Sequence, residues 1–465
     1  MLKELSRALD QADAGRDGSL ERLFDFLKIP SVGTDPAHRD DTRRAGQWCV
    51  DQLADIGFDA RLVDSPGHPF VVAHRKDAGE GAPHLLYYGH YDVQPADPLD
   101  LWGHPPFEPV LILADHGERI VARGAVDDKG QLMTFVEAFR AWHETGETLP
   151  VNVTVFLEGE EESGSPSLEG FLKDHADELK ADVCVVCDTG MWDIATPAIT
   201  TSLRGMVYLE MIVQGPAQDL HSGMFGGLAL NPLQVLSRIV ARFHDDQGRV
   251  AVPGINDDVR EPDPGLIAAW DQLGFDVRGF LDSVGLEHSV GEQERTPLER
   301  LWSRPTLEMN GIWGGYIGEG AKTVIPAEAR AKLSCRLVPE QKPQQVIDAI
   351  QSFVEQIRPA DARVTWKEMG KEPAVVVPSE SPYIQAAKDG LKRIYNRDAE
   401  LIGCGGSIPV VAAIKKHLGC DAVLVGFSLD DDRMHSPNEK FERICFDRGI
   451  KSHVSIIAEM AKLSR

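Results

Sequence analysis

Five short segments spread along the chain each carry a side chain of the kind that binds divalent metal ions. The segments are GHYDVQP, RGAVDDKG, EGEEESGS, VVCDTG and MHSPNE, and they offer His90, Asp127, Glu162, Asp188 and His435. This mixed set of imidazoles and carboxylates suits zinc or manganese. Two ions roughly 3.5 to 4 Å apart need one bridging carboxylate and two capping ligands on each side, and such pairs activate water for hydrolysis. The sequence therefore predicts a fold that gathers these five segments around two metal ions.

The pattern of apolar segments predicts how they are gathered. From about residue 20 to 200, apolar strands alternate with helices, which indicates a largely parallel sheet with helices on both faces. Ligands of such sheets lie beyond the carboxyl ends of the strands. His90, Glu162 and Asp188 each lie just past an apolar strand. The strands are expected at 69–74, 84–88, 151–157 and 182–186, and the helices at 131–143 and 167–179.

The middle of the chain has a different pattern, and its elements follow the split ferredoxin-like order β-α-β-β-α-β. The strands are expected at 206–214, 306–312, 329–337 and 362–367, and the helices at 232–244 and 343–357, with an acidic addition at 245–304. After about residue 380 the α/β pattern returns, with a helix at 382–395 and a strand at 422–427. Because His435 joins ligands from the first part, we expect residues 201–378 to be inserted into a metal-binding domain made of residues 1–200 and 379–465.

Composition excludes several classes of function. A chain of 465 residues exceeds the usual limit of about 250 to 300 for a single core, so two domains are expected. Its 48 Lys and Arg against 73 Asp and Glu give a net charge of −25, which argues against binding nucleic acid or anionic membranes. No apolar run approaches the roughly 18 residues of a membrane span, and the first 27 residues are expected to form a surface helix without a signal sequence. Seven cysteines in mostly apolar surroundings indicate reduced thiols and a cytoplasmic protein.

Residues beside the candidate ligands have predicted roles. His90 and Asp92 are two apart on a strand and point to one side, so Asp92 can accept the second imidazole N–H and orient the ligand without binding metal. Asp127 and Asp128 are adjacent like charges at the start of a helix, which favours a nearby cation or the helix N-terminus. The carboxylate run Glu160–Glu162 would usually be a solvated turn, but here it follows an apolar strand and reaches the ligand edge of the sheet.

The five segments, in this order and around an inserted β-α-β-β-α-β domain, resemble the M20 family of di-metal peptidases and amidohydrolases. Further motifs resemble its cytosolic nonspecific dipeptidase and carnosinase branch, namely EESGS, DLHSGMFGG, GAKTVIP, CRLVP and GGSIPV. The resemblance covers nearly the whole chain. It implies a homodimer in which the inserted domain acts as lid and dimerisation domain, and it implies two divalent ions per subunit, zinc or manganese.

The resemblance also implies roles for individual residues of the metal site. Asp127 is implied as the bridging carboxylate, followed by a cis peptide bond, and the other four candidate ligands cap the two ions. Glu161 is implied as the general base. A base must be free to hold a proton, so Glu161 should stay uncoordinated while it contacts the water between the ions. Glu160 is expected at the solvent or outside the ligand shell.

Residues for substrate recognition leave alternatives open. His221 is either an ordinary loop residue or, as the resemblance implies, a residue that reaches the partner subunit's active site and stabilises the oxyanion. Arg336 lies among apolar residues of a strand and needs an anionic partner. That partner is either an internal carboxylate or, by resemblance, the substrate's C-terminal carboxylate, which a guanidinium can bind through two hydrogen bonds. Thr323 and Ser407, beside glycines, either donate to the substrate or pack within their loops.

The expected function is therefore metal-dependent hydrolysis of dipeptides or short peptides with a free C-terminal carboxylate. One alternative is an N-acyl-amino-acid amidohydrolase that uses the same metals and differs in what occupies the acyl side. A more distant alternative is a non-catalytic binding protein that keeps the fold. The presence of Glu161 and of all five ligands argues against this last possibility.

Overall fold

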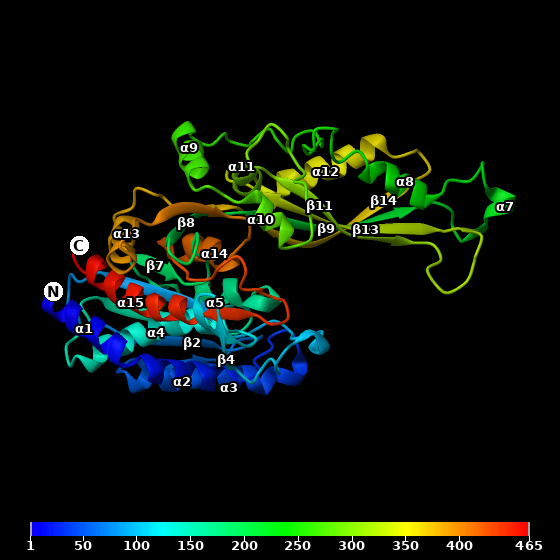
Figure 1. Cartoon of the computed structure of the whole chain (residues 1–465). Coiled ribbons are helices and arrows are strands. Elements are labelled where there is room, and N and C mark those ends of the chain that lie inside the picture. The colour runs from blue at the N-terminus through cyan, green and yellow to red at the C-terminus, as the bar shows by residue number, and fades with distance from the viewer. Residues whose placement is uncertain (1, 464–465) are drawn as a thin grey trace. The chain divides into compact units, whose positions relative to one another are not determined.

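The computed structural model describes residues 2–463, and the chain divides into two compact units. The first unit contains the residues up to Thr201, residues 377–402 and the residues from Pro409 onward. The second unit contains residues 202–376 and the short loop 403–408. Figure 1 shows the helices and strands of both units.

The loop 403–408 lies in the second unit, whereas the sequence pattern predicted it within the metal-binding domain. Two hydrogen bonds explain the difference. The backbone amide of Arg204 donates to the carbonyl of Gly406 at 3.0 Å, and Arg336 donates to the hydroxyl of Ser407 at 3.0 Å. Both contacts join segments that are distant in the sequence, so local patterns do not reveal them.

A sheet with parallel middle strands forms the centre of the first unit. Its order is β1-β2-β6-β3-β7-β17-β8, and β16 also pairs with β8. The pairs β6–β3, β3–β7 and β7–β17 are parallel, and the outer pairs β1–β2, β2–β6 and β17–β8 are antiparallel. Every residue of β3 and β7 is buried, which requires cover on both faces and confirms the predicted fold class. The strands are β1 (Asp59–Val63), β2 (Phe70–Arg75), β3 (His84–His90), β6 (Asn152–Glu158), β7 (Val183–Val186), β8 (Ala198–Leu203), β16 (Glu400–Cys404) and β17 (Asp421–Leu424).

Helices cover this sheet. The helix α4 is buried from Lys129 to Trp142 and packs against α1, α2 and α15, while α14 packs against α5, α6 and β17. The helix expected at 167–179 is broken at His175, whose ring stacks on Phe171. The helices are α1 (Leu2–Ala14), α2 (Arg16–Leu27), α3 (Arg39–Asp55), α4 (Lys129–Glu144), α5 (Leu168–Asp174), α6 (Ala176–Leu179), α13 (Pro382–Tyr395), α14 (Pro409–Leu418) and α15 (Arg443–Met460), with short 3₁₀ turns at Pro36–His38 and Leu99–Leu101.

A small antiparallel sheet in the same unit was not predicted. Its order is β18-β5-β4, made of β4 (Val110–Ala114), β5 (Gly117–Val121) and β18 (Lys440–Glu442). It places Lys440 opposite Val121, so a segment near the end of the chain lies beside the segment that leads into α4.

The second unit contains a four-stranded antiparallel sheet in the order β11-β13-β9-β14. With α8 and α12 this is the predicted ferredoxin-like arrangement. Buried and partly buried residues alternate along β13, which indicates that one face of the sheet packs on the core. The main elements are β9 (Gly205–Gln214), α8 (Pro232–Val240), β11 (Thr306–Gly314), β13 (Glu328–Leu337), α12 (Pro343–Ile357) and β14 (Arg363–Glu372).

The remaining elements of the second unit are short. They are β10 (Leu220–His221), α7 (Ser222–Phe225), α9 (Pro264–Gln272), α10 (Val277–Asp282), α11 (Pro297–Trp302), β12 (Val324–Ile325) and β15 (Val375–Val376). The helices α9, α10 and α11 lie in the acidic stretch 245–304. Within residues 2–463, no helix combines the length and apolar character needed to span a membrane. All seven cysteines are free thiols, as predicted.

Candidate metal centre

Three of the five candidate ligands lie at one edge of the central sheet of the first unit. His90 is the last residue of β3, and Asp188 follows the end of β7. Glu162 lies in the 3₁₀ helix η3 (Glu161–Ser163), which begins shortly after β6. Because β6, β3 and β7 are parallel neighbours, their carboxyl ends meet, as the sequence predicted.

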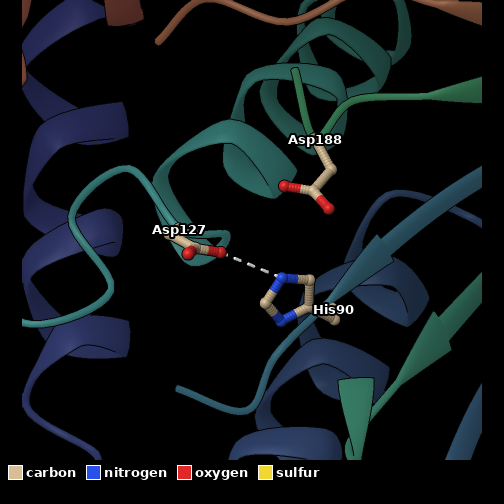
Figure 2. A group of neighbouring side chains, drawn as sticks. All are labelled: His90, Asp127 and Asp188. Atoms are coloured by element: carbon tan, nitrogen blue, oxygen red, sulfur yellow. Dashed lines mark hydrogen bonds and ion pairs between the residues drawn. The ribbon is translucent and has the colours of Figure 1, made fainter. Parts of the chain in front are cut away.

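Asp127 lies between two groups of ligands. Its Oδ1 is 3.1 Å from Nε2 of His90, and its Oδ2 is 3.0 Å from Nε2 of His435. One group consists of His90, Asp127 and Asp188, and the other of Asp127, Glu162 and His435; in each, the ligand atoms lie within 4.8 Å of one another. Figure 2 shows the first group, with Asp127 and Asp188 both near the imidazole of His90. The peptide bond between Asp127 and Asp128 is cis, as the resemblance implied.

Two of the three carboxylates in these groups, Asp188 and Glu162, have raised pKa values. Burial raises the pKa of Asp188 to about 7, and the neighbouring charges of Asp127 and Glu162 add to the effect while His90 opposes it. Burial and the charge of Asp127 also raise the pKa of Glu162. Oε1 of Glu162 is buried and has no hydrogen-bond partner among the described residues. Unpartnered buried carboxylate oxygens beside two imidazoles fit divalent cations, which would stabilise the ionised carboxylates.

The neighbouring carboxylates raise the pKa values of the imidazoles of His90 and His435. Burial disfavours a charged His90, but hydrogen bonds to Asp127 and Asp92 raise its pKa well above the ordinary value. Hydrogen bonds to Asp127 and Glu162 raise the pKa of His435 to about 10, although partial burial opposes them. Burial alone would raise the pKa of Asp127, but the hydrogen bonds to His435 and His90 lower it. Metal ions would replace the protons on these imidazoles, because only neutral imidazole binds a metal.

Asp92 connects His90 with the carboxylate run. Nδ1 of His90 lies 3.1 Å from the backbone carbonyl of Asp92 and 3.5 Å from its carboxylate, so the nearer acceptor is the carbonyl rather than the predicted carboxylate. The Asp92 carboxylate accepts the backbone N–H groups of Glu161 at 3.2 Å and Glu162 at 3.0 Å. Asp92 therefore holds the backbone of the carboxylate run as well as orienting the imidazole.

Glu161 belongs to neither group of ligands. It is partly buried in η3, directly before Glu162. Burial raises its pKa well above the ordinary value; the charge of His90 opposes this shift, and that of Asp188 adds to it. A carboxylate outside the ligand set with a raised pKa is suited to accept and release a proton.

Several contacts that support the candidate ligands were not predicted. Glu160 lies outside both ligand groups, which was one of its two expected positions. Glu160, expected at the solvent or outside the ligand shell, is 1% exposed and accepts the backbone N–H groups of Ser167 at 2.6 Å and His68 at 3.0 Å. The amide of Gln94 donates to Oε2 of Glu162 at 2.7 Å. The carboxylate of Asp128 accepts the backbone N–H of His90 at 3.0 Å. Only the adjacency of Asp128 to a candidate ligand could have signalled any of these contacts.

The candidate substrate residues lie in the second unit and form two pairs. Arg336 contacts Ser407, as described above, and no carboxylate of residues 2–463 lies within 4.0 Å of its guanidinium. The internal ion pair considered for Arg336 is therefore not observed. His221 is exposed in β10, and the backbone amide of the next residue, Ser222, donates to the carbonyl of Thr323 at 3.1 Å.

These two pairs are far apart within the second unit. β10 and β12 form a separate two-stranded sheet beyond the Glu328 end of β13, where Gly215 donates to the carbonyl of Ala327. Arg336 is near the other end of β13. At about 3.4 Å per residue, the eight steps from Glu328 to Arg336 span roughly 27 Å. Figure 1 shows α7, which follows His221, at one extremity of this sheet.

Known proteins resemble this chain over nearly its whole length. The model of a family described as "Peptidase family M20/M25/M40" matches residues 86–459. The Cys-Gly metallodipeptidase dug1 of Schizosaccharomyces pombe is 30% identical over 478 residues, covering 100% of both chains. The Beta-Ala-His dipeptidase of Homo sapiens is 28% identical, covering 99% of this chain and 93% of its own. The crystal structure of human carnosine dipeptidase 1 has a TM-score of 0.85 at 28% identity and covers 99% of each chain.

Proposed function

Because the chain belongs to the M20/M25/M40 peptidase family, we propose that it hydrolyses dipeptides or short peptides with a free C-terminal carboxylate. The observation that carries the proposal is the position of Asp127 between two groups of ligands, with the uncoordinated Glu161 nearby. Two divalent cations would fit these groups: Asp127 would be shared between them, His90 and Asp188 would hold one, and Glu162 and His435 would hold the other. We propose zinc, with manganese as the second possibility.

In the proposed reaction, the metal ions would activate water and the protein would transfer the proton. When bound, a pair of divalent ions supplies Lewis acidity and makes water a stronger nucleophile at neutral pH. Glu161 accepts the proton of the attacking water and passes it to the nitrogen of the leaving amine. Asp92 fixes the backbone of Glu161 and so holds this base in place. The peptide bond is thereby replaced by a carboxylate and a free amine.

Arg336 is the proposed receptor for the substrate's C-terminal carboxylate. Its guanidinium donates to the hydroxyl of Ser407 and, among residues 2–463, has no carboxylate within 4.0 Å, although its charge acts on Glu372 across the sheet. We propose that its charge is available to a ligand. A guanidinium binds a carboxylate through two parallel hydrogen bonds. Ser407 and Thr323 are proposed as further donors. This recognition confines hydrolysis to short substrates with a free carboxyl end.

We propose a homodimer in which the second unit is the lid and dimerisation domain and His221 acts on the partner's substrate. A dipeptide spans at most about 7 Å, far less than the roughly 27 Å of strand between the two candidate pairs. His221 and Arg336 of one chain therefore do not fit on one dipeptide. Near the β10–β12 pair, α7 with the loop after it and the loop before β12 expose large apolar side chains, namely Met224, Phe225, Leu228, Tyr316 and Ile317. Exposed apolar groups of this kind favour a protein interface.

The test is hydrolysis by protein reconstituted separately with zinc and with manganese. Dipeptides such as Cys-Gly, β-Ala-His and Ala-Ala are compared with N-acetyl amino acids. The proposal predicts turnover of dipeptides well above that of the acylated amino acids. Preference for the acylated compounds would instead support the amidohydrolase, and metal-loaded protein without activity on either class would support a binding protein.

Gel filtration with light scattering tests the proposed dimer. We also propose a cytoplasmic location, because the seven cysteines are free thiols.

A further inference from the structure

A buried carboxylate outside the ligand set joins the two loops that carry Asp127 and His435. Glu439 is fully buried and accepts four hydrogen bonds from the segment 123–127. Its Oε2 accepts from the guanidinium of Arg123 at 2.7 Å and from the backbone amide of Gly124 at 2.9 Å. Its Oε1 accepts from the backbone amides of Val126 at 2.9 Å and Asp127 at 3.0 Å. Each carboxylate oxygen thus has two donors.

Three of these four donors are backbone groups, and the last belongs to the shared ligand itself. The contact therefore does more than neutralise Arg123. Arg123 is 1% exposed, donates to the carbonyl of Pro95 at 3.1 Å and lies over the ring of Trp102 at 5.4 Å. A carboxylate held by a buried guanidinium and three amides has one orientation, and it fixes the path of the chain into Asp127.

Glu439 lies four residues after His435, in a loop that is closed at its base. Asp432 accepts from the ammonium of Lys440 at 2.6 Å, and the backbone amide of Lys440 donates to the carbonyl of Asp432 at 2.9 Å. Within the loop, the side chain of Asn438 accepts from the amide of Gly103 at 2.7 Å and donates to the carbonyl of Leu101 at 2.8 Å. His435, whose side chain is 57% exposed, therefore depends on the loop for its position.

We propose that Glu439 is a positioning residue that fixes the separation of Asp127 and His435 and thereby sets the metal affinity of the group Asp127, Glu162 and His435. The inference rests on the proposed ligand roles of these residues. Mutation of a residue that holds a metal ligand typically lowers metal affinity or activity roughly 10- to 100-fold. Loss of the four hydrogen bonds to Glu439 should therefore weaken zinc binding to this group by a similar factor, because zinc binding would first have to order the two loops.

The test measures zinc binding to metal-free protein by calorimetry and by competition with a chelating indicator. Glu439→Gln keeps the size of the side chain but replaces one acceptor oxygen with a donor, which faces the N–H groups. We expect one of the two zinc ions to bind roughly 10- to 100-fold more weakly. The matched control is Glu442→Gln at the end of the adjoining strand β18, where a buried carboxylate pairs with Arg119 and Lys440 and has no hydrogen bond to the segment 123–127. The control should bind zinc as the wild type does.

Glu439→Gln also leaves the buried guanidinium of Arg123 without its charge partner, which can itself destabilise the fold. The double variant Arg123→Met with Glu439→Gln removes that charge while the amides of Gly124, Val126 and Asp127 stay unclamped. We expect it to fold, by circular dichroism, and to keep the zinc defect. Wild-type zinc affinity in the double variant would show that Glu439 only neutralises Arg123 and would overturn the proposal. Unchanged affinity in a folded Glu439→Gln, or an equal loss in Glu442→Gln, would overturn it as well. Because no substrate is used, failure of the proposed peptidase activity would be a separate result.

Discussion

Asp127 uses its two carboxylate oxygens on two different imidazoles, and this is the feature on which the proposed metal pair depends. A single-ion site would not need one carboxylate shared by two groups of ligands. The residues around it divide into those that have a free buried oxygen, such as Glu162, and those that are fully engaged by N–H groups, such as Glu439. The first kind can accept a cation, and the second kind can only hold the backbone.

Neighbouring glutamates in η3 should respond oppositely to the same substitution. Glu161→Gln should keep two metal ions and lose on the order of 100- to 10,000-fold in turnover, because only proton transfer is removed. Glu162→Gln should lose metal, because Glu162 belongs to a ligand group. Elemental analysis and steady-state kinetics on both variants check this. The opposite pattern would show that the assignment within the run is wrong by one position.

Metal removal should make stability depend on pH. Without metal, burial raises the pKa of Asp188 from 3.8 to about 7, so the folded state holds this proton more tightly than the unfolded state. Stability therefore falls as pH rises through that window. The pKa of His435, raised from 6.5 to about 10, acts in the same direction between those values, since the favourable charge is lost as pH rises.

We expect the thermal unfolding midpoint of metal-free protein to decrease as the pH is raised from about 5 to about 8. Zinc should oppose the fall, because it binds the deprotonated ligands and its affinity rises with pH. Thermal unfolding with and without zinc across this range is the measurement, and metal-free Asp188→Asn should show a smaller fall. A constant difference between zinc-loaded and metal-free midpoints would contradict the assignment of these ligands.

At the scale of elements, the sequence was sufficient to predict a strand where the strand is buried throughout and its pattern is local. β3, β6 and β7 are largely apolar and almost entirely buried, so their carboxyl ends and the ligands beyond them could be predicted from the sequence. The three residues of β18 have no such pattern, and they form a strand only because β5 lies beside them. Glu439 was missed for the same reason, since its partner Arg123 is 316 positions away. Long-range pairing of a short segment leaves no periodic signal in the sequence.

β13 carries two arginines that permit a controlled test of substrate binding. Arg336→Lys keeps the charge but loses the planar fork, so KM for dipeptides should rise roughly 10- to 100-fold with a smaller change in kcat. Dipeptide amides, which lack the carboxylate, should not distinguish the variant from the wild type. Arg330→Lys is the control, because Arg330 already pairs with Glu210 of β9 and Glu328 of β13. An unchanged KM in Arg336→Lys would exclude Arg336 as the carboxylate receptor.

At the scale of the whole molecule, each proposed active site combines Glu161 of one subunit with His221 of the other, so inactive variants of these two residues should complement each other in a mixed dimer. His221→Ala and Glu161→Gln should each be nearly inactive as homodimers, because one lacks the group that stabilises the oxyanion and the other lacks the base. In a mixed dimer, one of the two sites combines an intact Glu161 from one chain with an intact His221 from the other. Close to half of wild-type activity per mixed dimer is then the ceiling if the sites act independently. Differently tagged variants purified as mixed dimers provide the measurement, and double-tagged wild type provides the reference. If such dimers form but stay inactive, His221 must act within its own chain or only support its loop.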